Sequence, residues 1–127
     1  MDNSQYFYRT IIFSQKDNQV SLADVHQPEK ISPFEGWMGI VISLADGHHS
    51  IQELIDYLRG RYAEPPQNLE KTLHSIIERL EEGKLLQLSS KAVTLPYYLA
   101  SPIEQLDLHK AKELIQEDGY DNISELH

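Results

Sequence analysis

The chain has 127 residues, a net charge of −9 from 11 basic and 20 acidic side chains, no cysteine, and 40% apolar residues. A chain of this size buries about 65% of the surface it exposes when unfolded, which suffices for one core and excludes a two-domain enzyme. The lack of cysteine excludes disulfides, thiolate metal sites and a thiol nucleophile, and the negative charge disfavours nucleic acid as a ligand.

Neither the first residues nor the densest apolar stretch of the sequence indicates export or membrane insertion. The first five residues carry an acid and amides where a secretory signal has a basic region and an apolar run. The densest apolar stretch, Trp37 to Ala45, is far shorter than the roughly 20 residues that span a bilayer. We therefore expect a cytoplasmic protein without membrane contact.

The N-terminal third predicts two strands and a short edge strand. Residues 6–13 are dense in aromatic and β-branched side chains, which suit a pleated, partly buried surface. The turn residues 16–18 separate them from residues 19–25, whose polar and apolar side chains alternate, so these segments predict a hairpin. After Pro28, Glu29-Lys30-Ile31 can form only a short edge strand, because proline lacks the amide that a central strand donates.

A first helix is predicted to begin at Ser32. This serine is a capping hydroxyl, Pro33 occupies the first helical position, and Glu35 places an acid near the positive end of the helix dipole. Apolar residues, Trp37 among them, recur at spacings of three and four until Asp46-Gly47, where the glycine can end the helix. We expect Trp37 in the core.

Two further amphipathic helices follow. Ser50 and Glu53 form a capping box, after which an apolar stripe runs from Ile51 to Tyr62. The third stripe runs from Leu69 to Leu80 and stops at Gly83. Their order predicts a pair of adjacent helices.

The C-terminal part predicts one more strand and one more helix. Residues 84–88 are short and apolar, which favours a strand. Residues 101–104 repeat the signature of a cap, a proline and an acid, and predict a fourth helix that ends near Gly119. We divide the chain into a domain of residues 1–88 and an acidic extension of residues 89–127, of which the last eight residues are expected to fray.

This order of elements predicts an α+β fold, a winged helix-turn-helix with an N-terminal hairpin, an edge strand, three helices and a C-terminal helical extension. Residues 42–54, ISLADGHHSIQEL, resemble the PqqD family, the RiPP recognition elements, in the apolar helix that ends in Leu-x-Asp-Gly before a second helix. Residues 80–86 resemble the family's exit from its third helix. The match covers about residues 6 to 88; the strand truncated by Pro28 and the residues after 88 depart from the family pattern.

The resemblance implies a non-catalytic adaptor for the biosynthesis of a peptide natural product. Proteins of this family bind the leader segment of a ribosomally made precursor peptide and present it to a modifying enzyme, such as a radical or other tailoring enzyme. The leader would add as a strand beside the edge strand and rest against the third helix, which suits the unpaired groups of an edge. The implied peptide-binding residues are Glu29, Lys30, Ile31, Thr72, Ser75, Ile76 and Arg79.

Other functions have weaker support in the sequence. No catalytic motif, phosphate-binding glycine loop or dinucleotide fingerprint is present, so we expect no enzyme and no cofactor. His48 and His49 diverge in a predicted turn without a third ligand, so we expect no metal site. A winged-helix DNA-binding regulator is the main alternative, although the third helix has four acids against two bases; a general protein-interaction adaptor is another. The fourth helix could pack on its own domain, dock an enzyme or join two copies.

Overall fold

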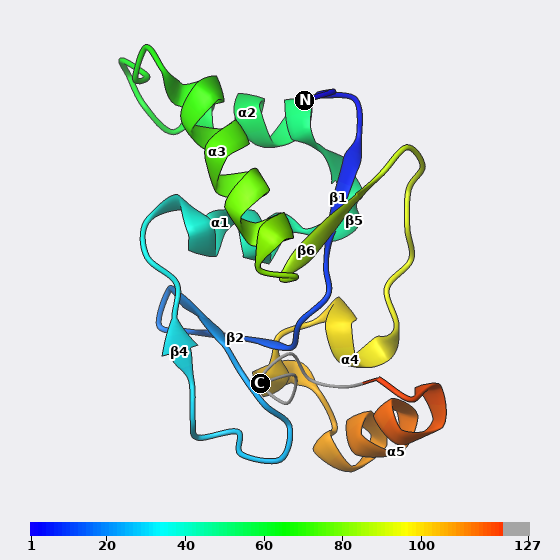
Figure 1. The fold of residues 1–127 in the computed structure, drawn as a ribbon. Helices are drawn as coiled ribbons and strands as arrows, with labels where there is room; N and C mark the ends of the chain where they lie inside the picture. The colour runs from blue at the N-terminus through cyan, green and yellow to red at the C-terminus, as the bar shows by residue number, and fades with distance from the viewer. Residues whose placement is uncertain (121–127) are drawn as a thin grey trace.

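The structure, a computed structural model, describes residues 1–120 and shows a mixed α and β fold with two three-stranded antiparallel sheets (Figure 1). One sheet has the order β5-β1-β6 and the other the order β2-β3-β4. The elements in chain order are β1 (Tyr6–Arg9), β2 (Phe13–Lys16), β3 (Gln19–Leu22), β4 (Ser32–Pro33), α1 (Trp37–Leu44), β5 (Asp46–Ser50), α2 (Ile51–Gly60), α3 (Leu69–Glu82), β6 (Leu86–Ser89), α4 (Tyr97–Ala100), the 3-10 helix η1 (Ile103–Gln105) and α5 (Leu108–Asp118).

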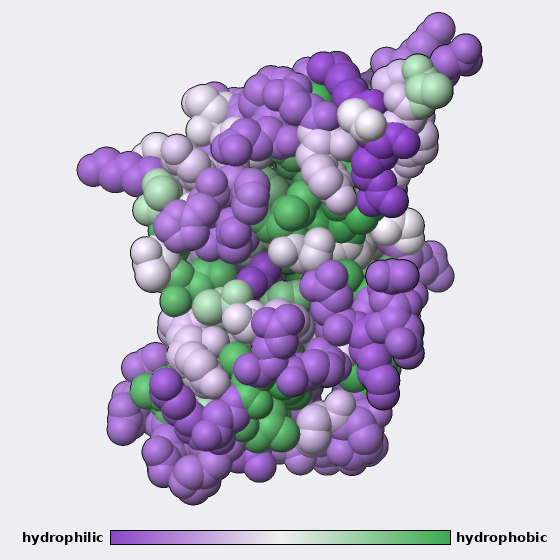
Figure 2. Space-filling view, turned by 180° about the vertical axis from the view of Figure 1, so that it is seen from behind, coloured by the Kyte–Doolittle hydropathy of each residue, from purple (hydrophilic) through white to green (hydrophobic). Residues whose placement is uncertain are grey.

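The molecule has an upper and a lower half in the view of Figure 1. Helices α1, α2 and α3 and the sheet β5-β1-β6 make the upper half, and the hairpin with β4, α4 and α5 makes the lower half. The single core that the chain length predicts is wrong, because two separate hydrophobic clusters correspond roughly to these halves. Seen from behind, hydrophobic side chains reach the surface in both halves (Figure 2). The buried members of the first cluster are Phe7, Ile11, Phe13, Val20, Val41, Ile42, Ala45, Ile51, Leu54, Ile55, Leu58, Leu69, Leu73, Ile77, Leu80 and Leu86. Those of the second cluster are Ile12, Ala23, Val25, Tyr98, Leu99, Ile103 and Ala111.

The predicted single strand over residues 6–13 is wrong, because the chain bends between β1 and β2 and enters a different sheet. Ile11 and Ile12 are both fully buried, but Ile11 packs in the first cluster and Ile12 in the second. Since neighbouring side chains of one straight strand point to opposite faces of the same sheet, the bend is what lets each isoleucine enter its own cluster.

The predicted hairpin is confirmed, with β2 and β3 paired from Phe13↔Leu22 to Lys16↔Gln19. Asp17 and Asn18 form its turn with φ of 53° and 64°. Positive φ at both central residues is the mark of a type I′ turn, whose twist matches the strands it joins.

The predicted start of the first helix is wrong, and so is the edge strand predicted at Glu29–Ile31. Ser32 and Pro33 form the edge strand β4, and the helix begins only at Trp37. The Phe34 amide donates to the Val20 carbonyl at 2.9 Å and holds this segment in the sheet. The pairing of β4 with β3 therefore overrides a local sequence signature that by itself favours a helix N-terminus.

The segment after α1 is also not the turn that Asp46-Gly47 predicts. Residues 46–50 form β5, which pairs with β1, although Gly47 does take the positive φ of 85°. The capping box of Ser50 and Glu53 at the start of α2 is confirmed, with both reciprocal hydrogen bonds present. Tyr62, predicted to continue the stripe of α2, lies beyond its end and is exposed.

Helix α3 is confirmed over the predicted range, but its exit differs in detail. Gly83 keeps a right-handed φ of −77° and Lys84 takes the left-handed conformation with φ of 62°. The fourth helix predicted from residues 101–104 to Gly119 is wrong as a continuous element, because η1 and α5 are separate helices and α4 lies before the predicted start. Its predicted end at Gly119 is confirmed. Residues 121–127, which include most of the end predicted to fray, lie outside the described residues.

The segment after residue 88 packs against the N-terminal hairpin. Tyr98, Leu99, Ile103 and Ala111 share the second cluster with residues from before and after β3. The extension therefore contributes to a core of the molecule, and packing on its own domain is one of the three arrangements that the sequence left open for its amphipathic helix. Among the helices of residues 1–120, none is both long and apolar enough to span a bilayer.

Candidate functional site

The strand edges are the candidate site, because a recognition module that adds a peptide strand needs an edge whose amides and carbonyls are unpaired. Two sheets have four outer edges, on β2, β4, β5 and β6. In an antiparallel pair, alternate residues direct their backbone groups toward the partner and away from it. The hydrogen bonds within each sheet therefore show which backbone amides and carbonyls point outward at each edge.

The edge of β5 is closed by the chain itself. The Val93 amide donates to the Gly47 carbonyl at 2.9 Å, so the segment after β6 runs along this edge as a strap. A Cβ on Gly47 would lie 2.2 Å from the Val93 carbonyl oxygen. Glycine is required here both by this contact and by its positive φ.

The edge of β2 is closed by a side chain. The Gln15 amide, which points away from β3, donates to Glu104 Oε1 at 2.9 Å, and the Ser14 hydroxyl donates to Oε2. Burial acts to raise the pKa of Glu104, but these hydrogen bonds outweigh it and the pKa lies below its ordinary value. The charged carboxylate thus occupies the place of a neighbouring strand.

The edge of β4 is partly open. The Phe34 amide donates to Val20, and Ser32 pairs with Leu22, so Ile31 and Pro33 direct their backbone groups outward. Ile31 is 41% exposed, and within residues 1–120 its amide makes no hydrogen bond. We call Ile31–Pro33 the β4 edge; it offers the amide and carbonyl of Ile31 and the carbonyl of Pro33, whose nitrogen carries no proton.

The edge of β6 is covered in part, because Leu86 is fully buried and Leu88 and Ser89 are half-buried. The Thr10 amide donates to Leu85 at 3.0 Å, and the register continues without a break from Arg9↔Leu86 to Tyr6↔Ser89. By alternation, Leu86 and Leu88 direct their amides and carbonyls away from β1. In the described part of the chain, no backbone group outside β1 bonds to this strand's outer side.

The structure does not bring the two halves of the predicted peptide site into one groove. Glu29, Lys30 and Ile31 lie in the lower half, in the loop before β4, and α3 lies in the upper half (Figure 1). Within residues 1–120 no hydrogen bond or ion pair joins the two sets. Lys30 and Ile31 instead line a pocket with residues of the β3–β4 connection, namely Leu22, Ala23, Asp24, Gln27 and Ser32.

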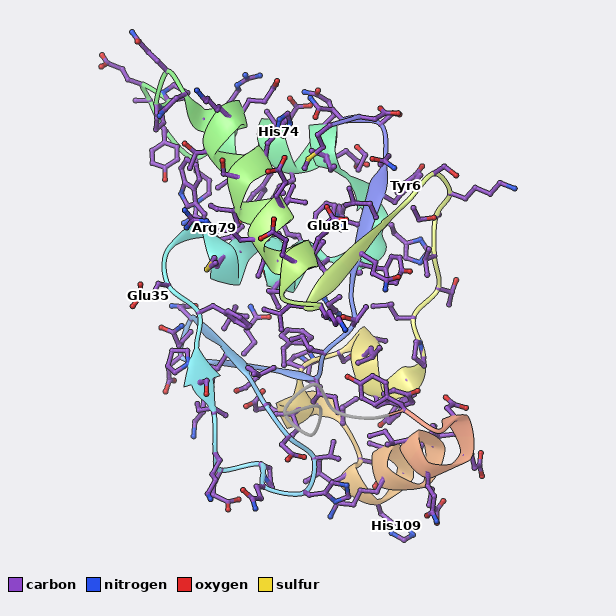
Figure 3. All side chains as sticks on the ribbon, in the orientation of Figure 1. Tyr6, Glu35, His74, Arg79, Glu81 and His109 are labelled. Atoms are coloured by element: carbon purple, nitrogen blue, oxygen red, sulfur yellow. The ribbon has the colours of Figure 1, made fainter. Side chains whose placement is uncertain are left out.

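The four predicted residues of α3 do share one flank of the helix. Thr72 and Ile76 are half-buried there, and Ser75 and Arg79 are exposed. Figure 3 shows Arg79 on the same side of the molecule as Glu35, in the connection from β4 to α1. A strand that extends from the β4 edge past Glu35 would therefore reach this flank.

Sequence reasoning missed Arg9, which is 2% exposed and ties the two halves together. Its guanidinium donates to the Ile42 carbonyl at the end of α1 (3.1 Å) and to the Leu99 and Ala100 carbonyls of α4 (2.7 and 3.0 Å). Burial lowers its pKa to about 10, partly opposed by the charge of Asp46. An arginine within an aromatic strand is the only signal the sequence carried.

The adjacent histidines His48 and His49 lie on β5. His48 is exposed on β5, and His49 shares a hydrogen bond of 2.8 Å with Asp46. In residues 1–120 no three His, Cys, Asp or Glu side chains are grouped so that they could hold a metal ion. His49 is thus a partner of Asp46, and neither histidine lies in the turn that we predicted.

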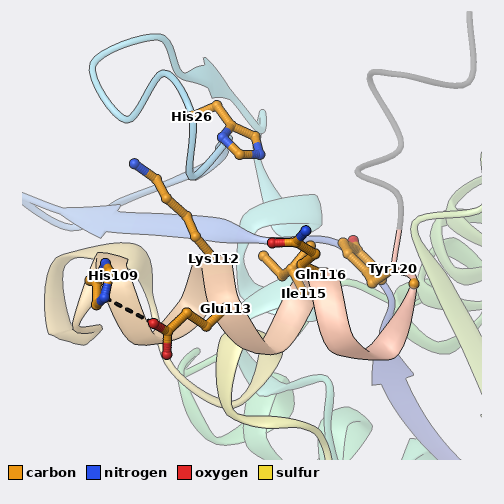
Figure 4. Close-up of a pocket in the computed structure, with 8 residues that line it drawn as sticks. His26, His109, Lys112, Glu113, Ile115, Gln116 and Tyr120 are labelled. Carbon is orange, nitrogen blue, oxygen red and sulfur yellow. Dashed lines mark ion pairs between the residues drawn. The ribbon is translucent and has the colours of Figure 1, made fainter.

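A cleft of mixed polar and apolar lining lies beside α5 (Figure 4). His109 and Glu113 form an exposed ion pair of 2.9 Å at its rim, and His26 and Lys112 face it from two sides. The ion pair is exposed and within one helix, where such contacts stabilise little. The cleft presents mixed charge and no convergent set of catalytic groups.

Comparisons with protein-family models, with curated proteins and with solved structures found no match to this chain.

Proposed function

We propose that the chain is a non-catalytic peptide-binding adaptor of the PqqD type, which captures the leader segment of a precursor peptide by strand addition at the β4 edge. The observation that carries this proposal is the unpaired amide of the exposed Ile31 beside a small pocket. A modifying enzyme that acts on the captured peptide is the expected second partner.

The arrangement of the upper half supports a winged helix-turn-helix as the scaffold. Helix α3 packs on both α1 and α2. A strand lies between α1 and α2, and another strand follows α3. In this chain the N-terminal β1 lies between those two strands.

The guest would lie along one side of the molecule. Its backbone would accept from the Ile31 amide and donate to the Ile31 and Pro33 carbonyls, and one apolar side chain would enter the pocket beside Leu22 and Ala23. In the described part of the chain, neither Lys30 nor Arg79 is ion-paired. Both cations are thus available to acidic residues of the guest, Lys30 beside the β4 edge and Arg79 on the flank of α3.

The test starts from a displayed library of random peptides, selected on the full chain, and measures the best binder by calorimetry. We expect Ile31→Pro to weaken binding by at least tenfold, because it removes the one outward amide of the β4 edge. Ile31→Val is the matched control: it keeps the amide and a branched apolar side chain, and should bind like the wild type. Equal binding by both variants would place the site elsewhere.

Binding to duplex DNA separates this proposal from a transcription regulator. Residues 68–82 hold four acids against two bases, so we expect no measurable affinity for duplex DNA at 150 mM salt, roughly the physiological value. Tight binding that falls steeply with salt would favour the regulator.

A further inference from the structure

A pocket of about 530 Å³ lies between the tip of the β2–β3 hairpin, helix α1 and the C-terminal end of helix α2. The hairpin contributes Gln15, Asn18 and Gln19, and the end of α2 contributes Tyr57 and Arg61. Ligand sites in proteins usually measure roughly 300–1,000 Å³, so this pocket has the size of a ligand site. None of the residues that form the β4 edge lines it, so it is a separate place on the molecule.

Three side-chain amides line the hairpin side of this pocket with unused hydrogen-bonding groups. The Gln19 amide donates to the carbonyls of Val20 and Phe34 at 2.9 and 3.1 Å, which fixes its position. In the described part of the chain the oxygen of this amide accepts no hydrogen bond, and the side chains of Gln15 and Asn18 make none. A side-chain amide both donates and accepts, as a peptide bond does. These side chains can therefore bind the backbone of an extended peptide.

Among the residues that line the pocket, all of which the structure describes, Arg61 alone is charged. Its guanidinium lies 5.9 Å from the centre of the Tyr57 ring, and within residues 1–120 it forms no ion pair. The ring contact orients the guanidinium and leaves its N–H groups available to a carboxylate, which arginine can bind with two parallel hydrogen bonds. A chain of net charge −9 thus presents an unpaired cation at this pocket.

Aromatic side chains extend the pocket onto the surface. Tyr57 is 50% exposed, and Tyr62, next to Arg61 in the chain, is 39% exposed. The Tyr62 hydroxyl accepts a hydrogen bond from the indole nitrogen of Trp37, and the two rings lie 6.3 Å apart. Tyrosine, tryptophan and arginine are enriched in protein interfaces, whereas sites for small metabolites are mostly apolar. The composition therefore favours a protein segment over a metabolite.

We propose that this pocket binds an extended peptide segment of a partner protein, and that the segment carries an aspartate or glutamate side chain. Its carboxylate pairs with the Arg61 guanidinium, and the amides of the hairpin bind its backbone. The proposal does not depend on peptide capture at the β4 edge, because the two places share no residue.

The first experiment titrates the isotope-labelled full chain with acetyl-Ala-Ala-Glu-Ala-Ala-amide and follows the NMR signals of the side-chain amides. We expect the signals of Gln15, Asn18 and Gln19 to shift until the site is saturated. The same peptide with Gln in place of Glu should bind about tenfold more weakly, because it lacks the charge-assisted pair. Free acetate that shifts these signals as strongly as the Glu peptide would overturn the assignment to a peptide. No shift at about 10 mM Glu peptide would overturn the whole proposal.

The second experiment compares substitutions of exposed arginines, which should not disturb folding. Arg61→Gln should weaken binding of the Glu peptide about tenfold. Arg59→Gln is the matched control two residues away: Arg59 lies 4.0 Å from Glu70 and does not line the pocket, so binding should stay unchanged. Equal binding by the wild type and Arg61→Gln would overturn the proposal.

An exchange of charges sharpens this test. Arg61→Glu should bind the peptide with Lys in place of Glu better than it binds the Glu peptide, since the two charges are then reversed. A preference for the Glu peptide in this variant would contradict the proposed ion pair. Ile31→Pro should bind the Glu peptide like the wild type, so this proposal and leader capture at the β4 edge can fail separately.

Discussion

The first cluster has sixteen buried members within residues 1–120, most of them from three helices and the sheet β5-β1-β6. The second cluster has seven buried members, and it is surrounded by hydrogen bonds from side chains that reach across the chain. Tyr120 donates to the Thr10 carbonyl, and Tyr98 donates to Asp118. Regular elements suffice to hold the first cluster, whereas a small core made of short segments depends on polar contacts as well.

These polar contacts can be removed by substitutions that leave the side chains of the first cluster unchanged. The carboxylate of Glu104 and the guanidinium of Arg9 are charged groups, and both bind groups on the other side of the second cluster. Substitutions can therefore separate the two regions.

Arg9→Leu should remove the tie between the halves and lower the free energy of unfolding by about 4 kcal/mol, because several buried carbonyls lose their donor. Urea unfolding followed by circular dichroism measures this loss. Arg9→Lys is the control: it keeps the charge but offers no planar fork of donors, and we expect a smaller loss. A loss below about 1 kcal/mol for Arg9→Leu would show that the tie is not needed.

Gly47→Ala tests the strap on β5, a place where the upper half depends on a chain segment from outside its regular elements. The added Cβ would lie 2.2 Å from the Val93 carbonyl oxygen at a φ of 85°. We expect a loss of about 2 kcal/mol in thermal unfolding and faster hydrogen exchange of the Val93 amide. Gly60→Ala, where nothing lies within 4 Å of the new Cβ, is the control and should not destabilise the protein. Normal exchange at Val93 in Gly47→Ala would contradict the role of the strap.

Glu104→Gln should cost about 1 kcal/mol at pH 7, because the charged acceptor of two hydrogen bonds becomes neutral. The pKa of Glu104 is lower in the folded protein than its ordinary value of 4.5. Its stabilising contribution is therefore complete above pH 4.5 and is lost as the pH falls through the lower, folded value. The free energies of unfolding of the wild type and Glu104→Gln, measured from pH 7 to pH 3, should converge at the acid end. A difference that stays constant with pH would exclude this carboxylate as the cause.

The sequence predicted the elements whose signals are local. The capping box of Ser50 and Glu53 and the periodic stripe of α3 depend only on residues within a few positions, and both helices were placed correctly. The type I′ turn at Asp17-Asn18 is local in the same sense. Such features can be predicted without knowing what the element packs against.

The errors occur where a distant contact decides. Ser32 and Pro33 carry the signature of a helix start, but the bond from Phe34 to Val20 places them in a sheet. The bend at Ile11 and Ile12 exists because two cores compete for adjacent residues. The candidate site shows the same pattern: the sequence indicated an edge near Pro28, but which edges are closed depends on Glu104 and Val93, far along the chain.

The single tryptophan of the chain gives these experiments a built-in optical reporter. Trp37 lies at the start of α1 and donates from its indole nitrogen to the Tyr62 hydroxyl at 3.0 Å, with the two rings 6.3 Å apart. Its fluorescence therefore responds to the packing of the first cluster, while the emission of the lower half comes from tyrosine alone. A fluorescence transition that occurs at higher urea than the loss of ellipticity would show directly that the lower half melts first.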